Sequence, residues 1–396
     1  MITIKQTLLE KIHLKIIEFS VNLYCIKFYF KPIQNNKIFM GSNNFLNYSC
    51  NPKYLAQYIS ENSDDFDLVW AFDEFVGIPE DFPKNIRHVQ YFSKEYLYEL
   101  FTSKIVIINH RMVPYLYFQK RRKQYYIQTW HSSVRLKKIE KDCENLLPKK
   151  YIKWAKKDSA KCDLIISGCD FSTEIYKNSF WYKGDILKSG TPRTAFLLKN
   201  DLNLKQKVCS YFNIDTGKKI VLYAPTFRNK DSRAVYDIDY IKLKKSLEKS
   251  FSGEWVVLLK LHPNLILPDF SLDTSNENCI DATLYGDIQE LLVASDVLIT
   301  DFSSCMFDYA FMRKPCILYA SDYEKYIKNE RELYFDIRKL PFSLATTNEE
   351  LDNIIKDFDQ SVYETKVDEF LNEIGSYEDA DANERILEHI KSVCFK

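Results

Sequence analysis

The sequence contains little glycine and little proline for its length. Only 9 of its 396 residues are glycine and 12 are proline, which excludes a long disordered or low-complexity arm. The glycine-rich loops that bind phosphate, a Walker motif or the pattern GxGxxG, are both missing. A nucleotide would therefore have to be held by helix ends and by single side chains.

Cysteine pairs are also missing. None of the ten cysteines belongs to a CxxC motif, and several lie in apolar runs such as Val208-Cys209, where a reduced thiol packs as a small hydrophobic group. We therefore expect neither a zinc site nor a disulfide framework, and we expect the protein to reside in a reducing cytoplasm. No cluster of carboxylates suited to a divalent metal is evident, apart from Asp301 and Asp308. We therefore predict no cofactor and leave open whether the protein requires a metal.

The chain has no net charge, because 55 Lys and Arg residues balance 55 Asp and Glu residues. This balance argues against a nucleic-acid partner. The charges are unevenly distributed, since residues 104–161 contain 16 basic and 4 acidic side chains, whereas residues 348–388 contain 14 acidic and 3 basic ones. The basic stretch suits an anionic substrate or an anionic membrane surface, and the alternative is a basic helix face in solvent.

Long uncharged hydrophobic runs are absent from the N-terminal segment. Between residues 2 and 30, charged side chains such as Lys5, Glu10 and Lys15 interrupt the apolar stretch, which argues against a membrane-spanning helix and a cleavable signal. The apolar residues recur at helical spacing, with lysines elsewhere around the helix. Residues 1–30 are therefore predicted to form an amphipathic helix that either lies in a membrane interface or packs on the core.

Short runs of β-branched and aromatic residues alternate with longer amphipathic stretches, a pattern typical of βα units around parallel sheets. The sequence predicts strands at Lys37–Met40, Leu68–Phe72, His88–Tyr91, Ile105–Ile108, Tyr125–Thr129, Leu164–Ser167, Ile220–Tyr223, Trp255–Leu261, Val297–Thr300 and Cys316–Tyr319.

A break near residue 190 divides these strands into two series. We therefore expect an α/β protein with two Rossmann-like domains, residues 31–192 and 193–396, that face each other across a cleft. Ligands bind outside the carboxyl ends of the strands in such sheets. The helical pattern at residues 382–393 is assigned to the second domain as its closing helix, and a crossing back to the first domain is the alternative.

Two of the six histidines stand at the ends of predicted strands. The strand Tyr125–Thr129 delivers His131 into a polar turn, and Trp255–Leu261 does the same for His262, which a proline follows. A histidine at the carboxyl end of such a strand lies where a substrate binds, and imidazole exchanges protons near neutral pH. Each histidine alone is more simply structural, but one in each domain favours a catalytic role.

Polar residues follow the apolar strand Val297–Thr300. Ser303 and Ser304 open a helix predicted at residues 304–311. A serine here is a natural N-cap, and the free amides of the first turn, together with the hydroxyls, would suit a phosphate group. Asp308 lies one turn further, where a carboxylate could meet the hydroxyls of a ribose or a polyol. The alternative is a simple helix cap.

Two further segments complete the expected cleft. Pro225, Thr226 and Arg228 follow the strand Ile220–Tyr223, which places a hydroxyl and a guanidinium at the mouth of the second domain. Arg193 lies at the domain junction, where it could bind a phosphate in a bidentate manner. For both arginines the alternative is a structural ion pair.

Several segments, taken in order, resemble one known family. The set comprises Asn51-Pro52-Lys53-Tyr54, Gln128-Thr129-Trp130-His131, Gly190-Thr191-Pro192-Arg193, Tyr223-Ala224-Pro225-Thr226, Leu261-His262-Pro263, the segment from Ser295 to Tyr309, Lys314-Pro315 and Asp322-Tyr323. Over residues 38–336 the chain resembles the CDP-glycerol glycerophosphotransferases, the primases and polymerases of bacterial teichoic acids and capsules.

The resemblance implies a glycosyltransferase-B architecture, in which the second domain holds a CDP-polyol and the first receives the acceptor. His131 then corresponds to the base that removes the proton from the acceptor hydroxyl, and His262 to a ligand or proton donor of the pyrophosphate. The expected substrate site consists of Ser132, Ser133, Arg135, Arg193, Pro225, Thr226, Arg228, Lys260, Ser303, Ser304 and Asp308.

The chain departs from the family pattern next to the expected base. The family usually has Trp-His-Gly-Thr-Pro, whereas this segment reads Trp130-His131-Ser132-Ser133-Val134. Similarly, Arg193-Thr194-Ala195 stands where the family usually has Arg-Asn-Asp. These loops border the substrate, so the departures bear on the identity of the donor rather than on the histidine.

The resemblance implies transfer of glycerol phosphate or ribitol phosphate from a CDP-polyol to a hydroxyl of a lipid-linked or polymeric anionic glycan, with release of CMP. Together with the basic stretch and the amphipathic helix, it predicts a cytoplasmic protein that is peripheral on the inner face of the cell membrane. Two other functions fit the same residues: a nucleotide-sugar glycosyltransferase of the same architecture, and a catalytically silent protein that binds the polymer.

Overall fold

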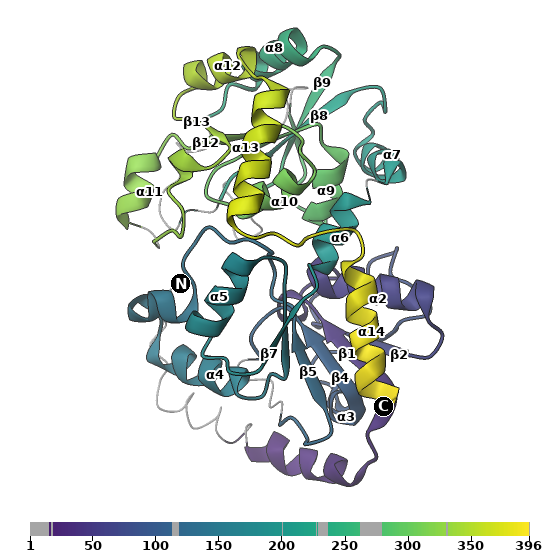
Figure 1. Cartoon of the computed structure of the whole chain (residues 1–396). Helices are drawn as coiled ribbons and strands as arrows, with labels where there is room; N and C mark the ends of the chain where they lie inside the picture. Colours follow the sequence, from purple (N-terminus) through teal and green to yellow (C-terminus); the bar gives the residue numbers. More distant parts are fainter. Residues whose placement is uncertain are drawn as a thin grey trace.

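The computed structural model describes residues 16, 19–112, 119–199, 201–226, 228, 237–261, 279–329 and 332–395. His262 and most of the predicted N-terminal helix lie outside these residues. In the described part, two parallel β-sheets form the cores of two α/β domains, one above the other in Figure 1. The predicted fold class is confirmed.

The first domain contains a seven-stranded sheet with the order β3-β2-β1-β4-β5-β6-β7, in which every neighbouring pair is parallel. The strands are β1 (Gln34–Gly41), β2 (Asp67–Phe72), β3 (Arg87–Gln90), β4 (Ser103–Ile108), β5 (Tyr125–Gln128), β6 (Leu164–Ser167) and β7 (Asp185–Lys188). The helices are α2 (Cys50–Asn62), α3 (Lys94–Thr102), α4 (Lys149–Ser159) and α5 (Asp170–Ser179), with the 3-10 helices η1 (Ile26–Phe30), η2 (Asn43–Phe45) and η4 (Glu140–Leu146).

The second domain contains a six-stranded parallel sheet with the order β10-β9-β8-β11-β12-β13. Its strands are β8 (Lys219–Ala224), β9 (Trp255–Leu259), β10 (Cys279–Asp281), β11 (Val297–Thr300), β12 (Cys316–Tyr319) and β13 (Ser343–Ala345). Its helices are α7 (Leu202–Phe212), α8 (Tyr240–Phe251), α9 (Ile288–Ala294), α10 (Cys305–Phe311), α11 (Tyr323–Asn329), η7 (Ile337–Lys339), α12 (Asn348–Lys356) and α13 (Gln360–Glu373).

Both sheets reverse their strand order near the centre, between β1 and β4 in the first and between β8 and β11 in the second. At the junction of the domains, the loop after β5 contacts the loop after β11, where the amide of Leu136 donates to Ser304. Such switch points, at the carboxyl ends of parallel strands, are where open α/β sheets bind ligands. The topology therefore directs attention to the loops after β1, β4, β5, β8 and β11.

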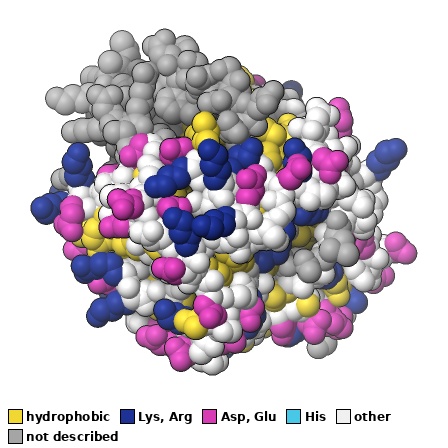
Figure 2. Space-filling view, turned by 90° about the horizontal axis from the view of Figure 1, so that it is seen from above, with side chains coloured by type: hydrophobic (Ala, Val, Ile, Leu, Met, Phe, Trp, Pro, Cys, Tyr) yellow, Lys and Arg dark blue, Asp and Glu magenta, His cyan; other side chains and the backbone are white. Residues whose placement is uncertain are grey.

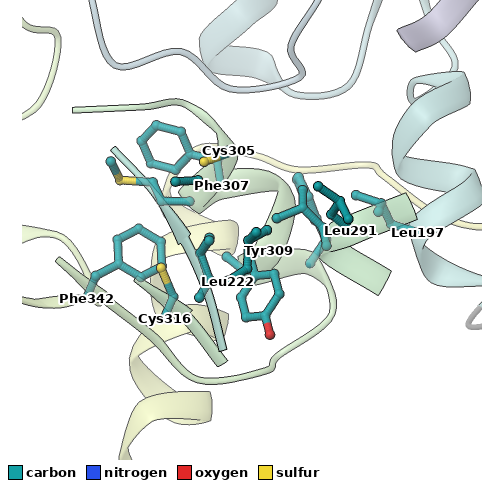
Figure 3. Close-up of a cluster of buried hydrophobic side chains, with 14 of the residues drawn as sticks. Leu197, Leu222, Leu291, Cys305, Phe307, Tyr309, Cys316 and Phe342 are labelled. Carbon is teal, nitrogen blue, oxygen red and sulfur yellow. The ribbon is translucent and has the colours of Figure 1, made fainter. Parts of the chain in front are cut away.

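The core of the second domain supports one of these loops. Phe307 and Tyr309 of α10 lie in one buried cluster with Leu222 of β8 and Leu291 of α9 (Figure 3). All ten cysteines are free thiols, and nine are buried; Cys305 and Cys316 belong to this same cluster. Because α10 is fixed by its packing, the residues before it are held in a defined position.

The C-terminal helix α14 (Ala382–Phe395) belongs to the first domain. Ile386, Leu387 and Ile390 are buried in the same cluster as residues of β1 and β4, and α14 lies beside α2 in Figure 1. The prediction that this helix closes the second domain was wrong. The chain instead crosses back to the first domain, which was the alternative. The short helix α6 (Pro192–Leu198) makes the first connection between the domains.

Charged side chains of both signs are mixed on the face of the molecule shown in Figure 2. In this view from above, the Lys and Arg side chains of the coloured part are interspersed with Asp and Glu side chains. Within the described residues, no helix is both long and apolar enough to span a membrane.

Candidate active site

His131 lies just after β5, at the carboxyl end of the first sheet, as predicted. Its side chain is solvent-exposed, and its Nδ1 lies 3.1 Å from the carbonyl oxygen of Asn109, which follows β4. A carbonyl oxygen can only accept a hydrogen bond, so Nδ1 carries the proton in the neutral ring. Nε2 is then the nitrogen with a free lone pair, and His131 has the tautomer that a general base requires.

The surrounding protein keeps this imidazole neutral. Although the side chain reaches solvent, protein atoms surround it closely enough that desolvation lowers the pKa of His131 to about 4. The positive charges of Arg193 and Arg135 act in the same direction, while the hydrogen bond to Asn109 opposes them. A neutral imidazole can accept a proton from a hydroxyl at physiological pH.

Arg193, at the start of α6, links the His131 loop to the second domain. One of its guanidinium nitrogens donates to the carbonyl oxygen of His131, and the other pairs with the carboxylate of Asp308 on α10. Both side chains are buried. The structure brings these two predicted site residues together as partners of each other, which is the structural ion pair considered for Arg193.

Ser303 and Ser304 lie where the two domains touch. Ser304 is the N-cap residue of α10, yet its hydroxyl makes no capping bond. It accepts a hydrogen bond of 3.3 Å from the backbone amide of Leu136, in the loop after His131. Ser303 accepts one of 3.4 Å from the amide of Cys305. The serines predicted for the donor site therefore adjoin the loop that carries the expected base.

Arg135 lies in that same loop and is only 3% exposed. One of its nitrogens, Nη2, donates to the hydroxyl of Tyr176 at 2.6 Å and to the carbonyl oxygen of Ser132 at 3.3 Å. Its Nε and Nη1 have no hydrogen-bond partner among the described residues. Buried donors without partners are costly, and an anionic group such as a phosphate would satisfy them.

The loop after β8 carries another unsatisfied group. The amide of Thr226, which follows Pro225, donates to Asp301 at 2.8 Å, while the buried Thr226 hydroxyl has no partner among the described residues. Arg228 instead bridges Asp301 and Asp322, with nitrogen to oxygen distances of 2.8 Å to both. The Thr226 hydroxyl is therefore unsatisfied in this part of the structure, whereas Arg228 makes the structural ion pair that was the alternative.

Lys260, predicted as a substrate ligand, is bound by the protein. Its ammonium group donates to the carbonyl oxygens of Thr283 at 2.6 Å and Tyr285 at 2.7 Å. Burial lowers the pKa of Lys260 to about 8. The neighbouring His262 lies outside the described residues, so its expected role stays a prediction. In the described part of the chain, no three His, Cys, Asp or Glu side chains are grouped to hold a metal ion.

Three residues near the site were not predicted as its members. Asn51 donates to backbone carbonyls just before His131, and Asn109 accepts from the imidazole. Glu378 accepts from the amide and hydroxyl of Thr191, at 2.8 Å each. Burial raises its pKa to about 7, although the hydrogen bonds from Thr191 oppose the rise. Two of them carried a sequence signal: Asn51 belongs to a segment that resembles the family, and Asn109 directly follows the predicted strand Ile105–Ile108.

Comparisons with known proteins connect this geometry to one family. Residues 23–392 match the family described as CDP-Glycerol:Poly(glycerophosphate) glycerophosphotransferase. The chain is 30% identical over 395 residues to the teichoic acid poly(glycerol phosphate) polymerase of Bacillus spizizenii, covering 96% of this chain and 99% of that protein. It is 31% identical over 390 residues to the teichoic acid glycerol-phosphate transferase of Staphylococcus aureus, covering 95% and 98%. It spans 46% of a longer polymerase, that of Bacillus subtilis.

Solved structures agree with this relationship. One structure of the wall teichoic acid polymerase TagF matches with a TM-score of 0.80 and 28% identity, over 95% of this chain and 98% of that one. A TagF variant soaked with CDPG for 15 minutes matches with a TM-score of 0.78 and 29% identity, over 91% and 90%. The expected GT-B-like architecture is confirmed. With its sequence matched over residues 23–392, the chain belongs to the CDP-glycerol:poly(glycerophosphate) glycerophosphotransferase family.

Proposed function

We propose that this protein transfers glycerol phosphate or ribitol phosphate from a CDP-polyol to a hydroxyl group of a lipid-linked teichoic-acid-type acceptor. The observation that carries the proposal is that one loop contains both an accessible, neutral His131 and, four residues later, the unsatisfied N–H groups of Arg135. The first group can remove a proton, and the second can bind a phosphate. Their loop contacts the second domain, because the amide of Leu136 donates to the hydroxyl of Ser304.

The reaction follows from these roles. Nε2 of His131 takes the proton of the acceptor hydroxyl, and the hydroxyl oxygen bonds to the phosphorus that carries the polyol. The bond from this phosphorus to the bridging oxygen of the pyrophosphate breaks, and CMP leaves with that oxygen. Negative charge develops on the phosphoryl oxygens, where the guanidinium of Arg135 and the hydroxyl of Thr226 stabilise it.

A panel of donors tests this proposal. The purified protein is incubated with a lipid-linked acceptor and, in separate reactions, with CDP-glycerol, CDP-ribitol or UDP-sugars, and the released nucleotide is identified. We expect CMP from at least one CDP-polyol. Release of UDP alone would identify a nucleotide-sugar glycosyltransferase, and no turnover of any CDP-polyol would favour a silent polymer-binding protein.

The pH dependence tests the state of His131. Because desolvation lowers the pKa of His131 to about 4, the base is neutral far below the usual imidazole value of about 6.5. We expect kcat/KM for CMP release to stay level from roughly pH 8 to pH 5 and to fall with a midpoint near 4. A midpoint at 6.5 or above would contradict the proposed environment of the base.

We also propose that the protein acts at the inner face of the cell membrane. Residues 19–25 are helical and continue into η1. Cys25 and Phe28 are buried against the first domain, whereas Phe19 is 70% and Phe30 85% exposed, with Ile16, Leu23 and Ile26 also exposed. This segment therefore packs on the core with one face and presents an apolar face outward, so the two alternatives from the sequence are compatible.

Replacing the exposed apolar side chains tests membrane binding. We expect the triple variant Phe19→Ser, Leu23→Ser, Phe30→Ser to bind vesicles of anionic phospholipid at least about tenfold more weakly, because each lost side chain contributes about 1.5–3 kcal/mol of burial. Co-sedimentation measures the bound fraction. Phe75→Ser is the matched control, since Phe75 is 87% exposed outside this segment. Equal binding by all three proteins would refute this surface as the anchor.

A further inference from the structure

The backbone turn that carries His131 is strained. Trp130, the residue before it, has a φ of 49°, in the left-handed region that bulky side chains rarely occupy. Such a conformation costs of order 1–3 kcal/mol and persists only where the surroundings hold it. The side chain of Trp130 stacks on the imidazole of His131, with ring centroids 4.4 Å apart. The position of the imidazole therefore depends on whatever holds this turn.

Two buried amide side chains hold the turn. Gln128 accepts a hydrogen bond of 2.9 Å from the Trp130 amide. Asn51, which has no exposed surface, donates from Nδ2 to the carbonyl oxygens of Thr129 and Trp130, at 3.1 Å each. In this strained turn the two carbonyls converge on the same nitrogen. Asn51 therefore stabilises the conformation of the turn that carries His131.

The other end of the Asn51 amide faces the domain junction. Its Oδ1 accepts a hydrogen bond of 3.0 Å from the backbone amide of Arg193. The side chain of Arg193 in turn contacts the carbonyl oxygen of His131 and the carboxylate of Asp308 in the second domain. A single buried amide thus joins the His131 turn to the helix that connects the domains.

We propose that Asn51 is a positioning residue for the transfer reaction. It holds the Trp130 turn so that Nδ1 of His131 stays on the Asn109 carbonyl and Nε2 faces the acceptor hydroxyl. This inference rests on the proposed function, because it takes His131 as the base. Asn51 acts only through His131 and the junction, and it requires no contact with either substrate.

The isosteric variant Asn51→Asp is the sharpest test. A carboxylate can still accept from the Arg193 amide, but it has no proton for the two carbonyls. We expect kcat for CMP release to fall about 10- to 100-fold, since a displacement near 1 Å can cost about 100-fold, while KM for the CDP-polyol changes less than about twofold. Asn51→Ala, which adds no charge, should show the same loss. Unchanged kcat in both variants would overturn the proposal.

Tyr54→Phe is the matched control on the same helix. The Tyr54 hydroxyl donates to Asp287 of the second domain at 2.7 Å and does not bond the His131 turn. We expect its kcat to stay within about threefold of the unmutated protein. A loss equal to that of Asn51→Asp would overturn the proposal, because it would show that any loosening of the domain contact has the same effect.

A second readout separates this proposal from the proposed function. In protein labelled with ¹⁵N-histidine, the two ring nitrogens of His131 report the tautomer directly, with His131→Ala identifying the signals. We expect the Nδ1–H form in the unmutated protein and a mixture of forms in Asn51→Asp. If the unmutated protein turns over no CDP-polyol, the proposed function fails, and these spectra still decide the role of Asn51. Unchanged His131 signals in Asn51→Asp would overturn that role even if kcat falls.

Discussion

Replacing His131 by alanine is expected to lower kcat for CMP release by about 100- to 10,000-fold, the range that a positioned general base contributes. An acceptor hydroxyl is a weak nucleophile until its proton is removed, and in the proposed reaction Nε2 of His131 removes it, while Nδ1 donates to Asn109. The contacts of Arg193 use the backbone carbonyl of His131, so the variant keeps them. We expect KM for the CDP-polyol to change little.

The control for this variant is another histidine of the same domain. His88 lies on the edge strand β3 and is exposed, so His88→Ala removes an imidazole without touching the cleft. Its kcat should equal that of the unmutated protein. Thermal unfolding of both variants shows whether the fold is retained. If folded His131→Ala kept more than about one tenth of the activity, general-base catalysis by this residue would be excluded.

Replacing Lys53 by methionine is expected to lower the free energy of unfolding by about 3–5 kcal/mol, the cost of removing one partner from a buried ion pair. Lys53 is 3% exposed, and its ammonium lies 2.7 Å from Asp287 and 2.8 Å from Glu290. These carboxylates belong to the other domain, so the variant leaves Asp287 buried without its cation and leaves Glu290 with only the half-exposed Lys207. Urea unfolding measures the loss.

Acid titration of the same variant checks the cause. Burial would raise the pKa of Glu290, but the charge and hydrogen bond of Lys53, aided by Tyr285 and Lys207, lower it to about 2. In the unfolded protein this carboxyl has an ordinary pKa of about 4.3. The stabilisation of the folded state by ionised Glu290 is therefore present above about pH 4.3 and is lost as the pH falls toward 2. In Lys53→Met we expect a smaller loss of stability between these pH values.

An exposed lysine provides the comparison for this prediction. Lys177 pairs with Glu174 across one helical turn, and both side chains are more than half exposed, at 54% and 61%. Surface pairs of this kind contribute little because water screens them. Lys177→Met should therefore leave the unfolding transition where it is. If Lys53→Met shifted it no further than Lys177→Met, the buried pair would not stabilise the domain contact.

The central strands of both sheets were predictable from the sequence because parallel strands covered on two faces must be apolar. The predicted segments Ile105–Ile108 and Val297–Thr300 lie within or coincide with β4 and β11. The strands β7, β10 and β13 were missed. Each lies at an edge of its sheet, where it is only three or four residues long and partly exposed, so it leaves no apolar run in the sequence.

The position of His131 at the carboxyl end of β5 is a local property, because a strand that ends in a polar turn must expose the next residue. The sequence by itself therefore determined the α/β class, the two sheets and the place of His131. The contacts that hold His131 were decided by tertiary structure alone. Asn51 reaches the turn from 79 residues away, and Arg193 meets Asp308 over 115 residues. A residue pattern encodes which side chains are polar, but their partners are set only when the two sheets and the helix between them pack together.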